Sequence, residues 1–487
     1  MQSTSILAQM AGAFQIRSVA GVVLVVAIFW AIATRKKEDG ILYANEYRNK
    51  LRTPEEAVKV VKSGDWVFMS HFAMFPQALD EALSKRVGEV HDVMVRSVCA
   101  TVSPKICAAD PEKKSFTYMS GYLSGHERKL GEKGLCYYIP GNYSASPTNI
   151  RNGNMYPPDV AMIQTTPPDN NGYFNFGTSV SYARATCEKA KTIILEVNDQ
   201  VPWVLGGEQE SIHISEVDYI VEKSYPLPQL PPTNTETEAE RAIASILIEE
   251  IEDGSCLQFG IGGMPNTIAK MIADSDLKNL GIHSEMATTS YIDLILKGKV
   301  NGSMKNIDRY KTVFTFAMGT QQLYDFLDRN PSFASYPVDI TNNPNRIALN
   351  DKQIAINNTV EIDLLGQISS ESSGTRQISG TGGQVDFTMG ASQSKGGKPF
   401  ICMSSTTMHG GKLTSRIVPS IKTFSAVTCP RTIAPTIVTE YGKAQLTGKS
   451  TFKRAEMLIE LAHPDFREDL IKAAQAQNIW TRTNKIS

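Results

Sequence analysis

The chain has 487 residues, too many for one ordinary hydrophobic core, so we expect two or three domains. Apolar residues make up 41% and charged residues 20%, as in soluble globular proteins, and the formal net charge is −1. No lysine- and arginine-rich block follows residue 40, which argues against a nucleic-acid partner. Seven cysteines without a C-x-x-C motif argue against a disulfide framework and a structural zinc site, so we expect no metal.

Residues 1–40 form an apolar leader. Its run from Ser18 to Thr34 carries no charge and has the minimum length of a membrane-spanning helix. The heavier positive flank, at residues 35–37, places the rest of the chain on the cytoplasmic side. A cleaved signal peptide and a start codon further downstream are the alternatives. We therefore expect a cytoplasmic protein, anchored through residues 18–34 if the leader is made.

The first predicted elements follow the leader directly. Thr53 and Glu56 make a capping box at the start of "TPEEAVKVV", which predicts a helix. Gly64-Asp65 ends that helix, and Trp66 to Phe72 has the composition of a buried strand.

This helix, turn and strand recur in the second half of the chain. Gly254 matches Gly64 at an offset of 190 residues, and the predicted strand Cys256 to Phe259 follows it. Further along, "VMVRSVCAT" aligns with "LGIHSEMAT", so Val98 corresponds to Glu285. The sequence therefore contains two copies of one α/β unit.

A proline-rich segment separates the two copies. The stretch "KSYPLPQLPPTNTETEAE" has four prolines and the composition of a linker. We predict an α/β fold of two similar open-sheet domains, at residues 42–225 and 241–487, joined by a linker at residues 226–240.

The stretch "GIHSEM" contains the strongest candidate for chemistry. Glu285 occurs in one copy, whereas a structural glutamate is expected in both. Alternation along a strand end predicts that His283 and Glu285 share one face. The H-x-E pattern of zinc deaminases needs a P-C-x-x-C partner motif, which the chain lacks. A partly buried surface glutamate is one alternative, and a covalent nucleophile toward an activated acyl group is the other.

Two glycine-rich segments accompany this glutamate. In "FGIGGMP", glycines between a strand and a helix let backbone N–H groups approach an anion, although a tight packing turn explains them equally well. The segment is neither G-x-G-x-x-G nor a P-loop. In "SGTGGQVDFTMGA", the loop before Gln384 is suited to an oxyanion, and a flexible hairpin is the alternative.

Several blocks in one order resemble the acetyl-CoA hydrolase/transferase family, the class I coenzyme A transferases. The resemblance is closest to the 4-hydroxybutyrate and butyryl-CoA:acetate CoA-transferases and covers about residues 42–480. The blocks include "GIGGMPNTIA", "GIHSEM", "VEIDLLGQ", "SGTGGQVDF", "VTEYGKAQLTGKS" and "AHPDFREDL". The chain departs from the family in its leader, and in Gln445, where an acidic residue is more common.

This resemblance implies a mechanism and a set of site residues. It implies that Glu285 attacks an acyl-CoA thioester, that a glutamyl-CoA thioester forms through an anhydride, and that a second acid takes the CoA. The acyl group is butyryl, 4-hydroxybutyryl or similar, and the acceptor is acetate or another acid. CoA is a substrate, and no permanently bound cofactor is implied. The implied CoA contacts are Gly260, Ile261, Gly262, Gly263, Met264, Val360 and Gly383.

Two other functions stay open at this point. One is an acyl-CoA hydrolase, in which water resolves the intermediate, and the other is a membrane-tethered, non-catalytic binding protein. The expected partners are an acyl-CoA, a short-chain carboxylic acid and further copies of the chain in a homo-oligomer.

The surroundings of Glu285 can also be predicted. An unperturbed glutamate has a pKa of about 4.3 and is ionised at neutral pH. We place the site in the cleft between the copies, where the loop "PPDNNGYFNFG" closes over Glu285 with Tyr173 and Phe174 as apolar cover against water.

Overall fold

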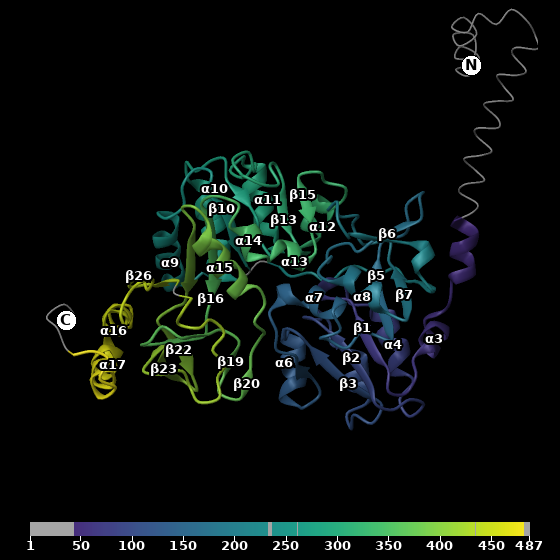
Figure 1. Cartoon of the computed structure of the whole chain (residues 1–487), viewed down its shortest axis with the longest axis horizontal. Helices are drawn as coiled ribbons and strands as arrows, with labels where there is room; N and C mark the ends of the chain where they lie inside the picture. Colours follow the sequence, from purple (N-terminus) through teal and green to yellow (C-terminus); the bar gives the residue numbers. More distant parts are fainter. Residues whose placement is uncertain (1–42, 232–235, 261, 434, 482–487) are drawn as a thin grey trace, which may run out of the picture.

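The computed structural model describes residues 43–231, 236–260, 262–433 and 435–481. The leader at residues 1–40, its candidate anchor at residues 18–34, and Ile261 lie outside these ranges. Within the ranges, no helix combines the length and the hydropathy that crossing a membrane requires. Figure 1 shows one α/β half in purple and blue and another in teal and green, followed by a yellow C-terminal part.

The first half is built on a seven-stranded sheet whose neighbouring strands are all parallel. The strands in spatial order are β4 (Tyr137–Tyr138), β3 (Phe116–Ser120), β2 (Val93–Ser97), β1 (Trp66–Met69), β5 (Val160–Thr165), β7 (Thr192–Val197) and β9 (Tyr219–Glu222). A helix at residues 43–50 precedes the sheet, and the labelled α-helices of this half are α3 (Pro54–Ala57), α4 (Gln77–Ser84), α5 (Lys105–Ala109), α6 (Gly125–Glu132), α7 (Ser146–Arg151) and α8 (Ala183–Lys189). A separate antiparallel pair joins β6 (Tyr173–Asn175) to β8 (Ser211–His213).

The second half is built on a six-stranded sheet that is parallel except for its last strand. Its spatial order is β11 (Gly281–Ile282), β10 (Cys256–Phe259), β16 (Gln353–Asn358), β21 (Lys398–Cys402), β25 (Thr436–Thr439) and β26 (Gly442–Gln445). Two parallel pairs flank it: β12 (Met286–Ala287) with β14 (Phe316–Ala317), and β13 (Thr312–Phe314) with β15 (Phe333–Ser335). The helices are α9 (Glu238–Ile248), α10 (Gly263–Asp274), α11 (Thr289–Leu296), α12 (Gln321–Leu327), α13 (Val338–Thr341), α14 (Pro344–Ile347) and α15 (Gln384–Gln393).

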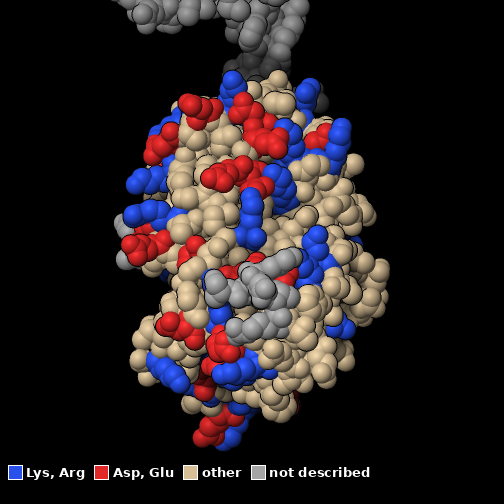
Figure 2. Space-filling view, turned by 90° about the vertical axis from the view of Figure 1, so that its left-hand side faces the viewer, with Lys and Arg blue, Asp and Glu red and all other residues tan. Residues whose placement is uncertain are grey.

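A smaller C-terminal part packs against the six-stranded sheet, in a core that joins Ile362, Leu458 and Trp480 to Ile401 of β21 and Ile437 of β25. Its elements are β17 (Glu361–Asp363), β18 (Ile368–Ser369), β19 (Ser372–Ser373), β20 (Arg376–Gln377), β22 (Thr406–His409), β23 (Lys412–Ser415), β24 (Ile417–Val418), α16 (Thr451–Glu460) and α17 (Pro464–Ala476). Figure 2 looks onto this side of the molecule and shows acidic and basic side chains interspersed.

The two halves begin with the same two features, a capping box and a left-handed glycine. Capping boxes open α3 at Thr53 and α9 at Thr237. The aligned glycines Gly64 and Gly254 adopt nearly the same left-handed conformation, with φ of +82° and +78°. In this region a side chain is strained, which explains glycine at both positions. The α/β class expected from the sequence is confirmed, while the domain limits at residues 42–225, 226–240 and 241–487 stay a prediction.

One aromatic core joins the halves. Phe72, from the first half, stacks on Phe316, from the second, with ring centroids 3.7 Å apart and an interplanar angle of 7°. Tyr143 of the first half and Met286 of the second belong to the same buried cluster. Because both halves contribute side chains to a single core, their relative position is fixed by packing.

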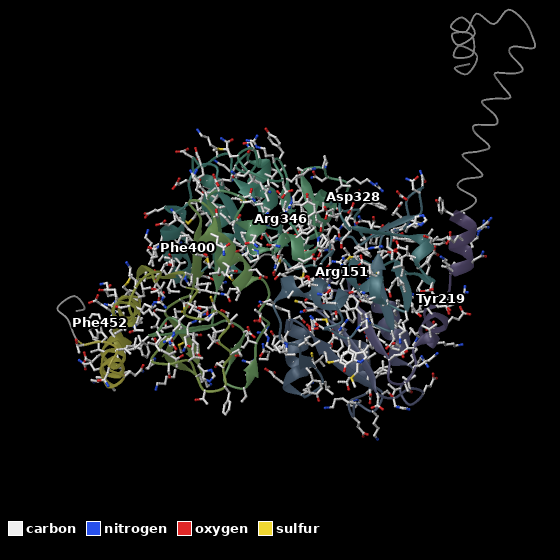
Figure 3. The ribbon with its side chains drawn as sticks, in the orientation of Figure 1. Arg151, Tyr219, Asp328, Arg346, Phe400 and Phe452 are labelled. Atoms are coloured by element: carbon white, nitrogen blue, oxygen red, sulfur yellow. The ribbon has the colours of Figure 1, made fainter. Side chains whose placement is uncertain are left out.

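Polar contacts cross the same boundary. Arg151, at the end of α7, lies 3.4 Å from the carboxylate of Asp339 in α13. The backbone N–H of Trp203 donates to Asp328 over 2.7 Å. Figure 3 labels Arg151 and Asp328 among the side chains between the halves.

We predict that Phe316→Ala weakens the shared core. Truncating a buried phenylalanine costs about 3–5 kcal/mol, so the urea midpoint of unfolding should fall clearly. Phe424 is 78% exposed, and Phe424→Ala is the matched control, with an expected change within about 0.5 kcal/mol. Equal midpoints for Phe316→Ala and the wild type would show that the stack does not hold the halves together.

Candidate active site

A cavity of about 330 Å³ lies where the two halves meet. Its wall includes Val98 and Tyr122 from the first half and Glu285 and Gly383 from the second. Three strands end at this wall, with Ser97 of β2, Phe259 of β10 and Asn358 of β16. Ligand sites of open parallel sheets lie at the carboxyl ends of the strands, so this is the expected position for a site. The cavity also brings together Val98 and Glu285, the matching positions of the two copies.

The backbone of Glu285 is held between two short strands. Its carbonyl oxygen accepts hydrogen bonds from the N–H groups of Thr315, at 2.9 Å, and Phe316, at 3.3 Å. These bonds lie beside the parallel pairing of β12 with β14. The partly exposed side chain of Glu285 faces the cavity from this fixed backbone.

Two donors hold the carboxylate of Glu285. Asn342 donates from Nδ2 to Oε2 over 2.5 Å, and the backbone of Gly383 also hydrogen-bonds the carboxylate. A Cβ at position 383 would lie 2.2 Å from Oε2 and 2.4 Å from Asn342 Nδ2. Position 383 therefore needs glycine for close approach, even though its φ of −99° suits any residue.

The electrostatic environment disfavours the ionised form of Glu285. The pKa of Glu285 is raised to about 7, mainly by burial. The hydrogen bonds from Asn342 and the backbone of Gly383 lower this pKa, and the charge of Asp386 raises it. The expectation of an unperturbed glutamate is therefore wrong. At neutral pH the carboxylate is close to its titration midpoint.

Asp386 is a buried carboxyl group close to the partly exposed Glu285. Burial raises its pKa to about 6, while hydrogen bonds from Ser144 and Asn342 lower it. Ser144 Oγ, which comes from the first half, donates to Asp386 Oδ1 over 2.9 Å. The amide group of Asn342 thus hydrogen-bonds both carboxyl groups, and the two titrate as a coupled pair.

The glycine loop before α15 is fixed by a third carboxyl group. Glu371 accepts hydrogen bonds from the hydroxyl groups of Thr381, at 3.0 Å, and Thr428, at 2.9 Å. Tyr138, from the first half, donates to the same carboxylate over 3.3 Å. The segment runs into the N-terminus of α15, with Gly383 as its N-cap, so the alternative of a flexible hairpin is wrong.

His283 does not share a face with Glu285. The strand β11 ends at Ile282, so the alternation predicted for "GIHSEM" stops before His283. Ser284 and Glu285 line the cavity, whereas His283 is buried behind it and lies 2.7 Å, from Nε2, from the carbonyl oxygen of Thr341. Burial lowers the pKa of His283 to about 3, so the ring is neutral.

The segment from Gly260 to Met264 divides between the cavity and the packing of α10. Gly260 lines the cavity. Gly262 is the N-cap of α10 with φ of +119°, a conformation that favours glycine. A Cβ at Gly263 would lie 2.4 Å from the carboxylate of Glu240, and Met264 is buried in the core of the second half. The position of Gly260 therefore fits a turn that approaches an anion, whereas the positions of Gly263 and Met264 fit a packing turn.

Val360 lies just before β17 and is not among the residues that line the cavity. Its N–H donates to the carbonyl oxygen of Ser369 over 3.0 Å, and its own carbonyl oxygen accepts from Arg416 Nε over 2.9 Å. Its neighbours in sequence, Asn357 and Asn358, line the cavity. Any CoA contact of Val360 therefore involves its half-buried side chain.

The predicted cover over Glu285 is wrong. Phe174 is fully buried in β6, where it pairs with Ile212, and its ring packs against Tyr47. Tyr173 lies 44% exposed against His213. The aromatic residues that line the cavity are instead Phe72, Tyr122, Tyr143, Tyr182, Phe259 and Phe316.

Sequence reasoning missed Asn342, which hydrogen-bonds Glu285, and Asp386, whose charge raises the pKa of Glu285. Asn342 lies 57 positions from Glu285, in a stretch whose asparagines predict only turns and caps. Asp386 stands inside the quoted glycine-rich block, and its position three residues after Gly383 was the available signal. Within the described residues, no group of three or more histidine, cysteine or acidic side chains is placed to hold a metal ion.

Comparison with known proteins assigns the chain to a family. Residues 35–231 match the model of the acetyl-CoA hydrolase/transferase N-terminal domain, and residues 319–474 match that of the C-terminal domain. The chain is 47% identical over 445 residues to the butyryl-CoA:acetate CoA-transferase of Anaerostipes caccae, which covers 91% of this chain and 100% of the relative. It is 40% identical over 425 residues to the 4-hydroxybutyrate coenzyme A transferase of Clostridium kluyveri, covering 87% and 97%.

A solved structure agrees with these matches. The crystal structure of RipA from Yersinia pestis superposes with a TM-score of 0.82 and 37% sequence identity, over 90% of this chain and 99% of that one. Family models match residues 35–231 and 319–474, and the relatives align with 87% and 91% of the chain. The chain belongs to the acetyl-CoA hydrolase/transferase family.

Proposed function

We propose that this chain moves coenzyme A from a short-chain acyl-CoA to acetate or a similar acid, with Glu285 as the nucleophile. By family membership and its relatives the chain is a CoA-transferase. The observation that carries the role of Glu285 is its carboxylate, held by Asn342 and Gly383 in the cavity between the halves. Butyryl-CoA is the first donor to test, because a 47%-identical relative is named for it.

The proposed reaction exchanges bonds without a redox change. A carboxylate oxygen of Glu285 attacks the thioester carbonyl carbon, the C–S bond breaks, and CoA leaves as the thiolate from an acyl-glutamyl anhydride. The thiolate then attacks the glutamyl carbonyl carbon, which releases the first acid and leaves a glutamyl-CoA thioester. The acceptor acid repeats these steps in reverse order and leaves as its CoA thioester.

The groups around Glu285 have proposed roles in these reaction steps. The N–H groups of Asn342 and Gly383 orient the carboxylate and can donate to an oxyanion that develops nearby. The aromatic wall keeps water from the thioester, which favours transfer over hydrolysis. We propose that Gly260, Gly262, Gly263, Met264 and Val360, together with Ile261, form the CoA side of the site. The proposal also includes a homo-oligomer and no permanently bound cofactor.

We predict that Glu285→Gln lowers the rate of CoA transfer by at least ~10³, because the covalent route needs an ionised carboxylate. The assay follows butyryl-CoA and acetate to acetyl-CoA, with free CoA measured in parallel. Wild-type enzyme treated with acyl-CoA and then borohydride should carry the reduced thioester at Glu285, seen by mass spectrometry.

Glu361→Gln is the matched control, because Glu361 lies on β17 and its carboxylate accepts the N–H of Lys422 at 3.1 Å. Full transfer activity in Glu285→Gln would exclude the covalent route. Mostly free CoA from the wild type at saturating acetate would favour the hydrolase.

We expect the pH dependence of kcat/KM for acyl-CoA to show an acid limb near the pKa of Glu285, about 7. The rate should rise with pH through this value, since the ionised form is the nucleophile. In Asp386→Asn the limb should move to lower pH, because the charge of Asp386 raises the pKa of Glu285. An unmoved limb would show that another group governs the profile.

The free energy of unfolding should fall as pH rises, whereas the rate rises. The pKa of Glu285 is raised in the folded state to about 7, above an unfolded value of about 4.3. The folded state thus binds more protons between these values, and Glu285 destabilises it increasingly as pH rises through them. Glu285→Gln should therefore raise the melting temperature more at pH 8 than at pH 5, as measured by calorimetry.

We predict that Gly383→Ala lowers transfer by about 10²-fold or more, because the added Cβ overlaps the Glu285 carboxylate and displaces it. Gly125→Ala is the control: a Cβ there meets no atom within 4 Å, at an ordinary φ. Steady-state kinetics on both variants, with circular dichroism for folding, make the comparison. Unchanged kcat in Gly383→Ala would contradict the placement of the nucleophile.

A further inference from the structure

His283 lies behind Glu285, fully buried and outside the lining of the cavity. Its Nε2 lies 2.7 Å from the carbonyl oxygen of Thr341. Because a carbonyl oxygen can only accept, Nε2 of the neutral ring carries the hydrogen and Nδ1 carries none. Among the described residues, Nδ1 has no hydrogen-bond partner. The bond to Thr341 therefore fixes both the tautomer and the orientation of the ring.

This bond holds the segment that carries Asn342. Thr341 is the last residue of α13, where the carbonyl groups have no partner within the helix. Asn342 follows directly and donates from Nδ2 to the carboxylate of Glu285. Its own Oδ1 has no partner in the part of the chain that the structure describes. Since the amide group is not anchored at its oxygen, its position depends on the backbone that His283 holds.

The same ring contacts the helix that carries the second donor. Its centroid lies 6.2 Å from that of Phe387, in an edge-to-face arrangement. Phe387 lies in the first turn of α15, and its N–H donates to the carbonyl oxygen of Gly383 over 2.9 Å. Gly383 is the N-cap of α15, and its backbone hydrogen-bonds the carboxylate of Glu285. His283 thus contacts both segments that hold the carboxylate.

The groups around His283 keep its ring neutral. Burial is the largest cause of its lowered pKa, about 3, and the charges of Lys305 and Arg346 lower the pKa further. The bond to Thr341 and the charge of Asp308 act in the opposite direction. The ring is therefore a hydrogen-bond donor without a charge.

His283 has no direct electrostatic effect on Glu285. The groups that shift the pKa of Glu285, besides burial, are Asn342, Asp386 and Gly383. The other titratable groups that interact with the Glu285 charge are Cys99, Tyr122 and Tyr143. Any influence of His283 on the titration of Glu285 therefore passes through the two donors.

The repeat also links this histidine to the glutamate. The first copy has Arg96 at the position that matches His283, and Val98 where the second copy has Glu285. The histidine thus occurs in the copy with the carboxylate and is missing from the copy without it. This difference is expected of a residue that serves the carboxylate, and not of one that the shared fold requires.

We propose that His283 is a positioning residue of the active site, whose neutral ring fixes Asn342 and the N-terminus of α15 so that both donors reach the carboxylate of Glu285. The inference rests on the proposed function, in which this carboxylate is the nucleophile. When the ring is removed, Asn342 can shift and the carboxylate loses a hydrogen bond that orients it. A misplacement of about 1 Å at a reacting group can cost about 10²-fold in rate.

The kinetic test compares His283→Gln with His283→Leu. The amide nitrogen of glutamine can take the place of Nε2 and donate to Thr341, whereas leucine has no donor. In His283→Leu, kcat for transfer from butyryl-CoA to acetate should fall by about 10–100-fold, with KM for butyryl-CoA near the wild-type value. His283→Gln should recover most of kcat. Equal losses of kcat in the two variants would overturn the proposal, because the donor would then be unimportant.

The acid limb of kcat/KM is a readout that a merely structural role would not move. The hydrogen bond from Asn342 lowers the pKa of Glu285, so its loss in His283→Leu should move the limb to higher pH. His283→Gln should keep the wild-type limb. An unmoved limb in a folded His283→Leu, with the fold checked by circular dichroism, would contradict the proposal.

His213→Leu is the matched control. Nε2 of His213 also contacts a backbone carbonyl oxygen, that of Asn171 at 3.1 Å, and His213 does not line the cavity. This variant should keep both kcat and the acid limb of the wild type. A shift of the limb as large as that in His283→Leu would show that the effect is not specific to His283.

Nitrogen-15 NMR of histidine-labelled wild type tests the tautomer without a variant of the active site. The signals of His283 are identified by their absence from His283→Gln. They should show a neutral ring with the hydrogen on Nε2 at about pH 6, well above its pKa of about 3. A ring with the hydrogen on Nδ1, or a charged ring, would refute the proposal even if His283→Leu does not fold.

The outcomes also distinguish this inference from the proposed function. Transfer that depends on Glu285, with kcat and the acid limb unchanged in His283→Leu, refutes the role of His283 alone. Transfer that survives Glu285→Gln refutes the proposed function, whatever the effect of His283→Leu.

Discussion

The stacking of Phe72 on Phe316 is the interaction on which the active site depends. The cavity takes its wall from both halves, so Glu285 faces Val98 only while the halves stay docked. Phe72 has a φ of +53°, which a bulky residue rarely adopts. Such a conformation costs of the order of 1–3 kcal/mol and persists where the surroundings fix it. The buried stack with Phe316 supplies those surroundings, and the position equivalent to Phe72 in the second half is the glycine that opens α10, Gly262.

Local signals in the sequence predicted much of this structure. The capping box at Thr53, the left-handed glycines Gly64 and Gly254 and the strand Cys256–Phe259 all depend on neighbours within a few residues. Glu285 was identified as a candidate because the first copy of the repeat has Val98 at the matching position. These features need no knowledge of distant contacts, which is why a single sequence reveals them.

The features that sequence reasoning missed depend on long-range packing. Asn342 reaches Glu285 across 57 positions, and Ser144 reaches Asp386 across the boundary between the halves. Phe174 has the apolar character of a cover, yet its strand pairs with that of Ile212 and its ring is buried in the aromatic cluster of Phe72 and Phe316, outside the cavity lining. The raised pKa of Glu285 has the same origin, because burial by residues from both halves is its main cause.

The duplicated fold divides the active site between its copies. The second copy supplies Glu285, the proposed nucleophile, whereas the first supplies Val98 at the equivalent position and most of the aromatic wall. Such a division has an evolutionary consequence. Substitutions in the first copy can alter the wall of the cavity while Glu285 and its two donors, Asn342 and Gly383, stay intact. Most of the aromatic wall and the donors that hold the Glu285 carboxylate are therefore encoded in different halves of one gene.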